Sequence, residues 1–223
     1  MTGYTRTKIC GLTTKGDALV AANCGVDAIG LIFFAESPRA VSRSVARDIA
    51  LAVGPFVTVV GLFVDAEPEF VDQVIATVPL QVLQFHGTET PDYCERFKRP
   101  YLKAIKVRPL EGEEVDQTSV AAVRQDILTQ AARFTNARGI LLDTLSSQAQ
   151  GGTGQSFDWR CVPENSEHHW ILAGGLNPTN VEAAVRAVRP YGVDVSSGVE
   201  LSRGVKDPKK IRQFIDRVRA ANY

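Results

Sequence analysis

Short apolar runs alternate with amphipathic stretches along the whole 223-residue chain, and this alternation limits the possible folds more than any other feature. The eight runs of strand length cover residues 7–12, 27–34, 56–64, 81–87, 101–107, 139–144, 169–175 and 193–199. Several are rich in Val, Ile and Leu, which is typical of parallel strands buried on both faces. The pattern therefore predicts an α/β fold with a parallel sheet.

Helical spacing fills the intervals between these runs. Apolar residues recur at i, i+3, i+4 and i+7 from Val71, from Val181 and from Ile211, and residues 119–133 also have a helical pattern. Each set forms one apolar stripe that can pack on a sheet. Eight such units in a chain of this length predict a single-domain (β/α)8 TIM barrel over residues 1–223. A doubly wound open sheet is the alternative.

Two helix starts carry capping signals. Thr14, with Asp17 three residues later, resembles a capping box. Asn177 is the predicted N-cap of a later helix, with Pro178 in its first turn. The connection over residues 108–138 is longer than a minimal strand-to-helix link requires.

Charge and cysteine content narrow the class of protein. Lys and Arg together number 25, as do Asp and Glu, so nucleic-acid binding through bulk charge is not expected. No stretch is apolar and long enough for a membrane span, and the first residues lack a signal-peptide layout. The four cysteines are far apart in sequence. This spacing argues against a zinc site or a disulfide framework and favours a reducing, cytoplasmic location.

In a TIM barrel the active site lies at the carboxyl ends of the strands, where inward residues alternate with outward ones. Apolar neighbours are expected to face the helices and to leave polar groups inside. The residues directed inward by this rule are Lys8 and Cys10, Gln84 and His86, and Leu141 and Asp143. The alternation therefore predicts that polar side chains from three distant segments meet inside the barrel mouth.

Cys10 and Asp143 are the strongest candidates for catalytic residues in this set. A lysine two residues before Cys10 on the same face would favour the thiolate, which is a usable base. A carboxyl group inside the barrel either needs a partner or stays protonated, and a protonated acid suits general acid catalysis. The alternatives are a buried small hydrophobe for Cys10 and a hydrogen-bonded structural residue for His86.

Two further features point to an anionic ligand. Arg39 follows the second strand, where its guanidinium group is either a solvated loop charge or a binding group for a substrate carboxylate. Glycine-containing segments follow the last three strands, at residues 151–154, 173–178 and 196–200. Backbone N–H groups in such loops can bind phosphate, although simple strand-to-helix turns are the alternative.

Taken in order, these motifs resemble those of phosphoribosylanthranilate isomerases. The matching segments are KICGLT, DAIGLIF followed by SPR, LQFHG, ILLDT, GGTGQSFDW, LAGGLNP and VDVSSGVE. Their combination is specific, although no single segment would be. The resemblance implies a (β/α)8 barrel that converts N-(5'-phosphoribosyl)anthranilate to 1-(2-carboxyphenylamino)-1-deoxyribulose 5-phosphate by an Amadori rearrangement, the third step of tryptophan biosynthesis.

The resemblance also implies roles for particular residues. Asp143 is expected to be the general acid at the ribose ring oxygen, and Cys10 the general base at C2'. Arg39 is expected to hold the anthranilate carboxylate, with Gln84 and His86 lining the pocket. The residues expected to bind the phosphate are Gly152, Gly154, Gly175, Ser197 and Gly198. No cofactor or metal is implied, because an acid and a base suffice. The expected partner is a small-molecule substrate, with no nucleic acid or membrane, and the chain is expected to be a monomer or a homodimer.

Two other functions stay open from the residues alone. One is a phosphosugar lyase or synthase that uses Lys8 or Lys103 as a base or imine former. The other is a barrel that binds a phosphometabolite without catalysis. A lysine-based lyase should tolerate Cys10→Ala, and a binding barrel should tolerate the loss of Cys10 or Asp143.

Overall fold

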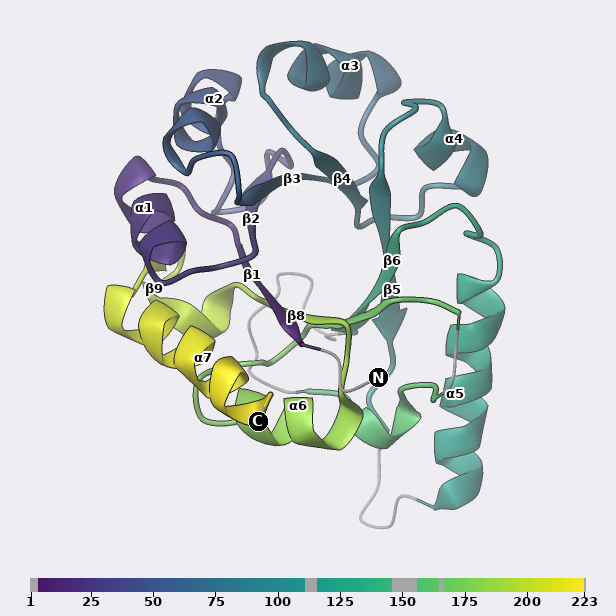
Figure 1. Ribbon diagram of the computed structural model, residues 1–223. Coiled ribbons are helices and arrows are strands. Elements are labelled where there is room, and N and C mark those ends of the chain that lie inside the picture. Colours follow the sequence, from purple (N-terminus) through teal and green to yellow (C-terminus); the bar gives the residue numbers. More distant parts are fainter. Residues whose placement is uncertain (1–3, 111–115, 146–155, 165–166, 223) are drawn as a thin grey trace.

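Eight parallel strands close into a barrel in the order of the chain, β1 to β8. The computed structural model describes residues 4–110, 116–145, 156–164 and 167–222. The barrel strands are β1 (Arg6–Cys10), β2 (Ala28–Ile32), β3 (Thr58–Phe63), β4 (Val82–Phe85), β5 (Tyr101–Val107), β6 (Gly139–Thr144), β7 (Trp170–Leu172) and β8 (Gly192–Val195). Strands β1 and β8 pair in parallel and complete the ring (Figure 1). The closed ring confirms the predicted barrel and excludes the open sheet.

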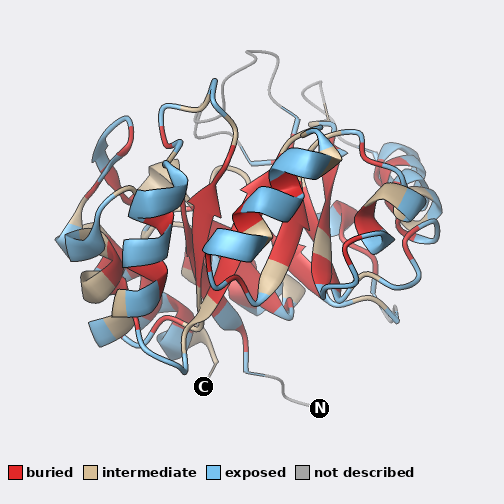
Figure 2. Ribbon diagram, turned by 90° about the horizontal axis from the view of Figure 1, so that it is seen from above, coloured by how far each residue is buried: buried red, intermediate tan, exposed pale blue. Residues whose placement is uncertain are grey.

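Within the described ranges, seven α-helices surround this ring (Figure 1). They are α1 (Lys15–Asn23), α2 (Arg43–Ala52), α3 (Pro68–Thr77), α4 (Pro91–Glu95), α5 (Gln117–Ala131), α6 (Val181–Val188) and α7 (Pro208–Ala221). In the view from above, the strands are buried and the outer faces of the helices are exposed (Figure 2). The apolar stripes predicted from sequence therefore face the sheet.

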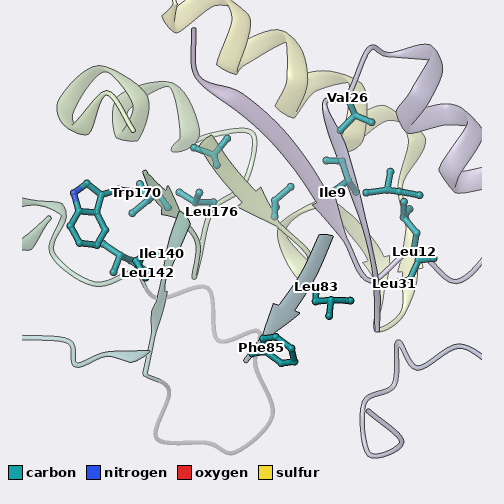
Figure 3. Packing of buried hydrophobic residues seen from close by; sticks show 14 of the residues in the cluster. Ile9, Leu12, Val26, Leu31, Leu83, Phe85, Ile140, Leu142, Trp170 and Leu176 are labelled. Atoms are coloured by element: carbon teal, nitrogen blue, oxygen red, sulfur yellow. The ribbon is translucent and has the colours of Figure 1, made fainter. Parts of the chain in front are cut away.

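The main core lies between the strands and the helices. Figure 3 shows outward side chains of the barrel in this layer, among them Ile9 of β1, Leu83 and Phe85 of β4, and Ile140 and Leu142 of β6. All five are almost completely buried. Because side chains alternate along a strand, the residues between them must point into the barrel.

Smaller clusters fill the barrel interior. Leu141 packs with Ala104 and Ile171 in one of them. Cys10 packs with Ile32 and Leu62 in the other. The inward orientations predicted for Leu141 and Cys10 are thereby confirmed.

One of the two predicted helix caps is confirmed. The Thr14 hydroxyl accepts a hydrogen bond from the Asp17 N–H at 3.1 Å and caps α1. The prediction of Asn177 as the N-cap of α6 is wrong, because Asn180 holds that position. The Asn177 side chain instead accepts the Thr179 N–H at 2.8 Å and closes a turn, which delays the helix to Val181.

The segment between β6 and β7 differs from a regular βα unit. The sequence predicts a helix opening at residues 157–159, but the described part of this segment contains only the 3₁₀ turn η1 (Trp159–Cys161). The Asp158 carboxylate accepts the Arg160 N–H at 2.9 Å and caps that turn.

A small antiparallel hairpin follows β8 and the 3₁₀ turn η2 (Ser197–Val199). Its strands are β9 (Glu200–Ser202) and β10 (Val205–Lys206), which form a sheet separate from the barrel. Gly204 in its turn has φ +83°, and a Cβ there would come within 2.8 Å of the Pro38 carbonyl oxygen. The hairpin therefore lies directly against the loop after β2. Among the described residues, no helix is both long and apolar enough to cross a membrane.

Candidate active site

A cavity of about 380 Å³ opens at the carboxyl ends of the barrel strands. The candidate residues that line it are Cys10, Arg39, His86, Asp143, Gly175 and Ser197. They come from six different strands or the loops after them. A concave site with a few converging polar groups is the usual form of a small-molecule site. Closure of the barrel thus brings together residues that the sequence separates widely.

Asp143 lies near the end of β6 with about one-fifth of its side chain exposed. Its Oδ2 atom lies 3.0 Å from His86 Nε2 and also contacts the Lys106 ammonium group. Burial by itself would raise the pKa of Asp143, but hydrogen bonding and charge from His86 and Lys106 outweigh it and hold the pKa below its usual range. Of the two states considered from sequence, the carboxylate with partners is the one found.

Lys106 was missed by the sequence reasoning. Its Nζ atom lies 2.8 Å from His86 Nε2, and it lines the cavity beside Asp143. A signal was available, because Ala104 and Lys106 share the inward face of β5 opposite Ile105 and Val107. The alternation places Lys106 on the inward face of β5, and a charged side chain at such a position is a signal for a functional residue.

Gln84 and His86 share the inward face of β4, as predicted. Gln84 is completely buried and, unlike His86, is not among the described residues that line the cavity, where both were expected. Its Nε2 atom lies 2.9 Å from His86 Nδ1. His86 therefore contacts Gln84 through one ring nitrogen and Asp143 through the other. This arrangement orients the imidazole towards the Asp143 carboxylate.

Cys10 is almost completely buried at the end of β1. Gly30 on the neighbouring strand leaves the space for it, since a Cβ there would come within 2.6 Å of the Cys10 sulfur. The neighbouring Lys8 Nζ lies 2.9 Å from Asp194 Oδ1, and this ion pair is itself buried.

In the free barrel, the lysine two residues before Cys10 does not make the thiolate the favoured state. Burial raises the pKa of the Cys10 thiol, and the lowering by Lys8 does not overcome this effect. Asp194, which the sequence reasoning did not weigh, also raises the thiol pKa and shares the lysine charge. Cys10 is therefore predominantly a thiol at neutral pH.

Arg39 is buried, which excludes the solvated loop charge considered from sequence. Its Nε and Nη2 atoms donate to the two oxygens of Glu200 at 2.7 and 2.9 Å. Gly11 makes room for it, because a Cβ at that residue would approach the Arg39 Cδ to 2.6 Å. These two hydrogen bonds to Glu200 fix the orientation of the Arg39 side chain, which would otherwise sample many rotamers.

The predicted phosphate-binding residues are only partly described. Gly152 and Gly154 lie outside the described residues, whereas Gly175 and Ser197 line the cavity. Gly198 does not line it; a Cβ there would overlap the Leu176 carbonyl oxygen, so this glycine allows the loops after β7 and β8 to pack closely. Phosphate binding by the set stays a prediction.

Lys8 and Lys103, the lysines considered for the alternative lyase, both form ion pairs with carboxylates. Lys103 faces the outer layer, where its Nζ atom lies 2.9 Å from Glu89 Oε2 and 2.7 Å from the Gly87 carbonyl oxygen. It is not among the described residues that line the cavity. Lys8 points inward, but its ammonium group is held by Asp194. This arrangement does not favour imine formation.

Comparison with known sequences identifies one family. A family model described as N-(5'phosphoribosyl)anthranilate (PRA) isomerase matches residues 7–217. Among curated relatives, an N-(5'-phosphoribosyl)anthranilate isomerase of Cellvibrio japonicus is 52% identical over 93% of this chain and 90% of its own. One of Stutzerimonas stutzeri is 50% identical over 96% of this chain and 97% of its own.

Solved structures give the same result. A phosphoribosyl anthranilate isomerase from Thermotoga maritima is 34% identical, with a TM-score of 0.80 over 97% of this chain and 99% of its own. A second such isomerase was solved in complex with reduced 1-(o-carboxyphenylamino)-1-deoxyribulose 5-phosphate. It is 34% identical, with a TM-score of 0.76 over the same shares of the two chains.

Proposed function

Because this chain belongs to the N-(5'-phosphoribosyl)anthranilate isomerase family, we propose that its barrel mouth converts N-(5'-phosphoribosyl)anthranilate to 1-(2-carboxyphenylamino)-1-deoxyribulose 5-phosphate. The protein is then an isomerase of tryptophan biosynthesis. The observation that supports this function best is the presence of Asp143 and Cys10 in one cavity. Their groups can serve two proton transfers of opposite direction, one to the substrate and one from it.

In the first step, a proton passes to the ribose ring oxygen while the bond from C1' to that oxygen breaks. The anthranilate nitrogen supplies the electron pair, and a protonated, positively charged imine forms at C1'. We assign the donor role to Asp143. Because its carboxylate is ionised in the free barrel, it must first receive a proton, and His86 Nε2 lies within hydrogen-bond distance of it. The His86–Asp143 pair would thus act as one proton-holding unit.

In the second step, Cys10 takes the proton from C2', and the released electron pair forms the double bond between C1' and C2'. The resulting enolamine becomes the ketone product when C1' gains a proton and the 2' hydroxyl group loses one. Cys10 has to release its own proton to solvent before this step, and burial in the free barrel opposes that ionisation. We propose that a cationic intermediate at C1' provides the opposite charge that favours the thiolate.

Arg39 is proposed to bind the anthranilate carboxylate. It lines the cavity, and Glu200 holds its guanidinium plane. Two of its nitrogen atoms are used in that pair, and a guanidinium group has five N–H donors in total. Donors are therefore left for a second carboxylate. The backbone around Gly175 and Ser197, together with the other predicted residues, is proposed to bind the phosphate.

The decisive experiment measures the loss of phosphoribosylanthranilate fluorescence with wild-type protein and Asp143→Asn. Wild type is expected to turn over the substrate, and the variant to lose a factor of about 10²–10⁴, as removal of a general acid does. Asp216→Asn, at an exposed position of α7, is the matched control and should retain full activity. Absence of turnover in wild type would refute the isomerase, and full activity of Asp143→Asn would refute its role.

A monomer is proposed to be sufficient for the reaction, because the described candidate side chains all come from one barrel. One relative from Thermotoga maritima is described as dimeric. If a homodimer forms here, kcat should be the same above and below its dissociation constant. A cytoplasmic location is also proposed, supported by four unpaired cysteines, and fractionation of cells would test it.

A further inference from the structure

A buried cluster of charges lies behind Arg39, away from the cavity surface. Glu200 binds Arg39 through both oxygens, and its Oε1 atom also lies 2.9 Å from Lys206 Nζ. The Lys206 side chain has no exposed surface. Lys206 also donates to the Ser196 carbonyl oxygen at 2.9 Å, and Ser196 lines the cavity. Lys206 thus links the Arg39–Glu200 ion pair to the loop after β8.

The charges of this cluster do not cancel. Arg39 and Lys206 are cations, and Glu200 is the only acid bonded to either among the described residues. With Lys206 present, Glu200 divides its charge between two cations, and the cluster keeps one net positive charge. Without it, Glu200 would neutralise Arg39 completely. A buried excess charge is costly unless an ion of opposite sign joins it.

The only member of the cluster that reaches the cavity is Arg39. The excess positive charge is therefore available to a ligand only there. An anion bound at Arg39 would bring the cluster to neutrality, whereas an uncharged ligand at the same place would not. The preference for an anion would thus depend on a lysine that the ligand does not touch.

We propose that Lys206 is a positioning and specificity residue that makes Arg39 select a carboxylated aromatic ring. This inference rests on the proposed function, because it takes Arg39 to be the carboxylate subsite. Lys206 acts through Glu200 and has no contact with the reacting atoms. Its removal should therefore weaken binding of the carboxylated substrate and raise KM.

A purely structural role for Lys206 predicts a different result. Loss of its bond to Ser196 would disturb the loop after β8 and weaken every ligand in the cavity. Two probes separate these cases: reduced 1-(o-carboxyphenylamino)-1-deoxyribulose 5-phosphate and the same compound without its carboxyl group. The ratio of their dissociation constants measures the contribution of the carboxyl group to binding, because the two probes are otherwise identical.

The experiment measures both dissociation constants by calorimetry for wild type and Lys206→Met. Wild type is expected to prefer the carboxylated probe. The variant should lose about tenfold of that preference, the scale of a buried charge that acts through one intervening side chain. Its kcat for phosphoribosylanthranilate at neutral pH should also fall, because the Lys206 charge lowers the pKa of the Cys10 thiol. The ratio of dissociation constants is therefore the deciding measurement, since binding of the two probes does not require Cys10 to ionise.

Lys103→Met is the matched control, since Lys103 is equally buried in an ion pair, with Glu89, on the outer side of the barrel. This variant is expected to lower the melting temperature and to leave the ratio unchanged. If Lys206→Met does not fold, Lys206→Gln provides the same test, because its amide can still donate to the Ser196 carbonyl.

The outcomes separate this inference from the proposed function. An unchanged ratio in the Lys206 variant, or an equal loss for both probes, would overturn the specificity role and leave the isomerase intact. Equal binding of both probes by wild type would remove the Arg39 subsite and this inference with it. Absence of turnover in wild type would refute the proposed function itself.

Discussion

The Nε2 atom of His86 lies 3.0 Å from Oδ2 of Asp143, which joins two residues 57 positions apart in the chain. Lys106 contacts the same carboxylate oxygen. The free barrel therefore holds Asp143 as a carboxylate between His86 and Lys106, with its pKa lowered. A role as proton donor consequently depends on a proton that arrives with the substrate or from His86.

The lowered pKa of Asp143 predicts how stability changes with pH. A carboxyl group with a lowered pKa in the folded state stabilises the fold above its unfolded pKa of about 3.9. This contribution is lost as the pH falls through the folded value. Urea unfolding of wild type and Asp143→Asn should show free energies that differ most near neutral pH and converge below about pH 4. Curves that stay parallel throughout would contradict the lowered pKa.

The raised pKa of Cys10 predicts an alkaline activity profile. If the Cys10 thiolate is the base, kcat/KM should increase as the pH rises above neutrality, because kcat/KM reports the free enzyme. Cys10→Ala should lose turnover by a factor of at least about 10² at every pH. Steady-state assays across the pH range provide the measurement.

Cys94 provides the matched control, as it is buried in α4 outside the cavity lining. Cys94→Ala should keep the wild-type profile. Full activity of Cys10→Ala, or inactivation by a thiol reagent that follows modification of Cys94, would show that the base is a different group.

Gly30→Ala is predicted to lower activity, because the added methyl group would crowd Cys10. A Cβ at Gly30 would lie 2.6 Å from the Cys10 sulfur and 3.1 Å from its Cα, so Gly30→Ala must displace the thiol or its strand. We expect turnover to fall at least about tenfold, with a destabilisation of about 1–3 kcal/mol, as in overpacked cores. Activity assays and thermal unfolding together measure both effects.

Gly16→Ala serves as the comparison in the same experiment. Gly16 lies in α1, is exposed, and has 3.9 Å between its ideal Cβ and the nearest atom, the Thr14 hydroxyl oxygen. Alanine there should stabilise the protein by about 0.4–1 kcal/mol and leave turnover unchanged. Equal effects of the two substitutions would argue against the crowding explanation.

Arg39→Lys is predicted to weaken substrate binding although it keeps the charge. Lysine cannot form the two-point contact with Glu200 and also present a planar donor set to the substrate. KM should rise by roughly 10–100-fold, with a smaller change in kcat. Arg43→Lys, at the exposed start of α2, is the control and should behave as wild type. Wild-type KM in Arg39→Lys would show that Arg39 does not bind substrate.

Much of the fold could be predicted because it depends on local pattern. The alternation of Ile9 with Cys10, and of Leu142 with Asp143, was sufficient to predict which side chains face the barrel interior. The N-cap of α6 could not be derived in this way. Asn177 and Asn180 both suit a cap, and hydrogen bonds within the turn between them decide which one is used. The extent of the domain, residues 1–223, stays a prediction.

The residues that hold the site residues in place were harder to predict from the sequence. Glu200 is 161 positions from Arg39, and Asp194 is 186 positions from Lys8. No periodicity joins positions so far apart. Lys106 is the exception, since its inward position follows from the alternation in β5.

The sequence by itself determined the eight alternating units, the inward direction of Cys10 and Asp143, and the family to which the chain is similar. These properties depend on the order and polarity of neighbouring residues. Only the tertiary structure decided the ionisation of the two groups, which the sequence left open: Cys10 is a buried thiol, and Asp143 is a carboxylate with partners. Ionisation depends on burial and on nearby charges, and closure of the barrel brings those charges from distant parts of the chain.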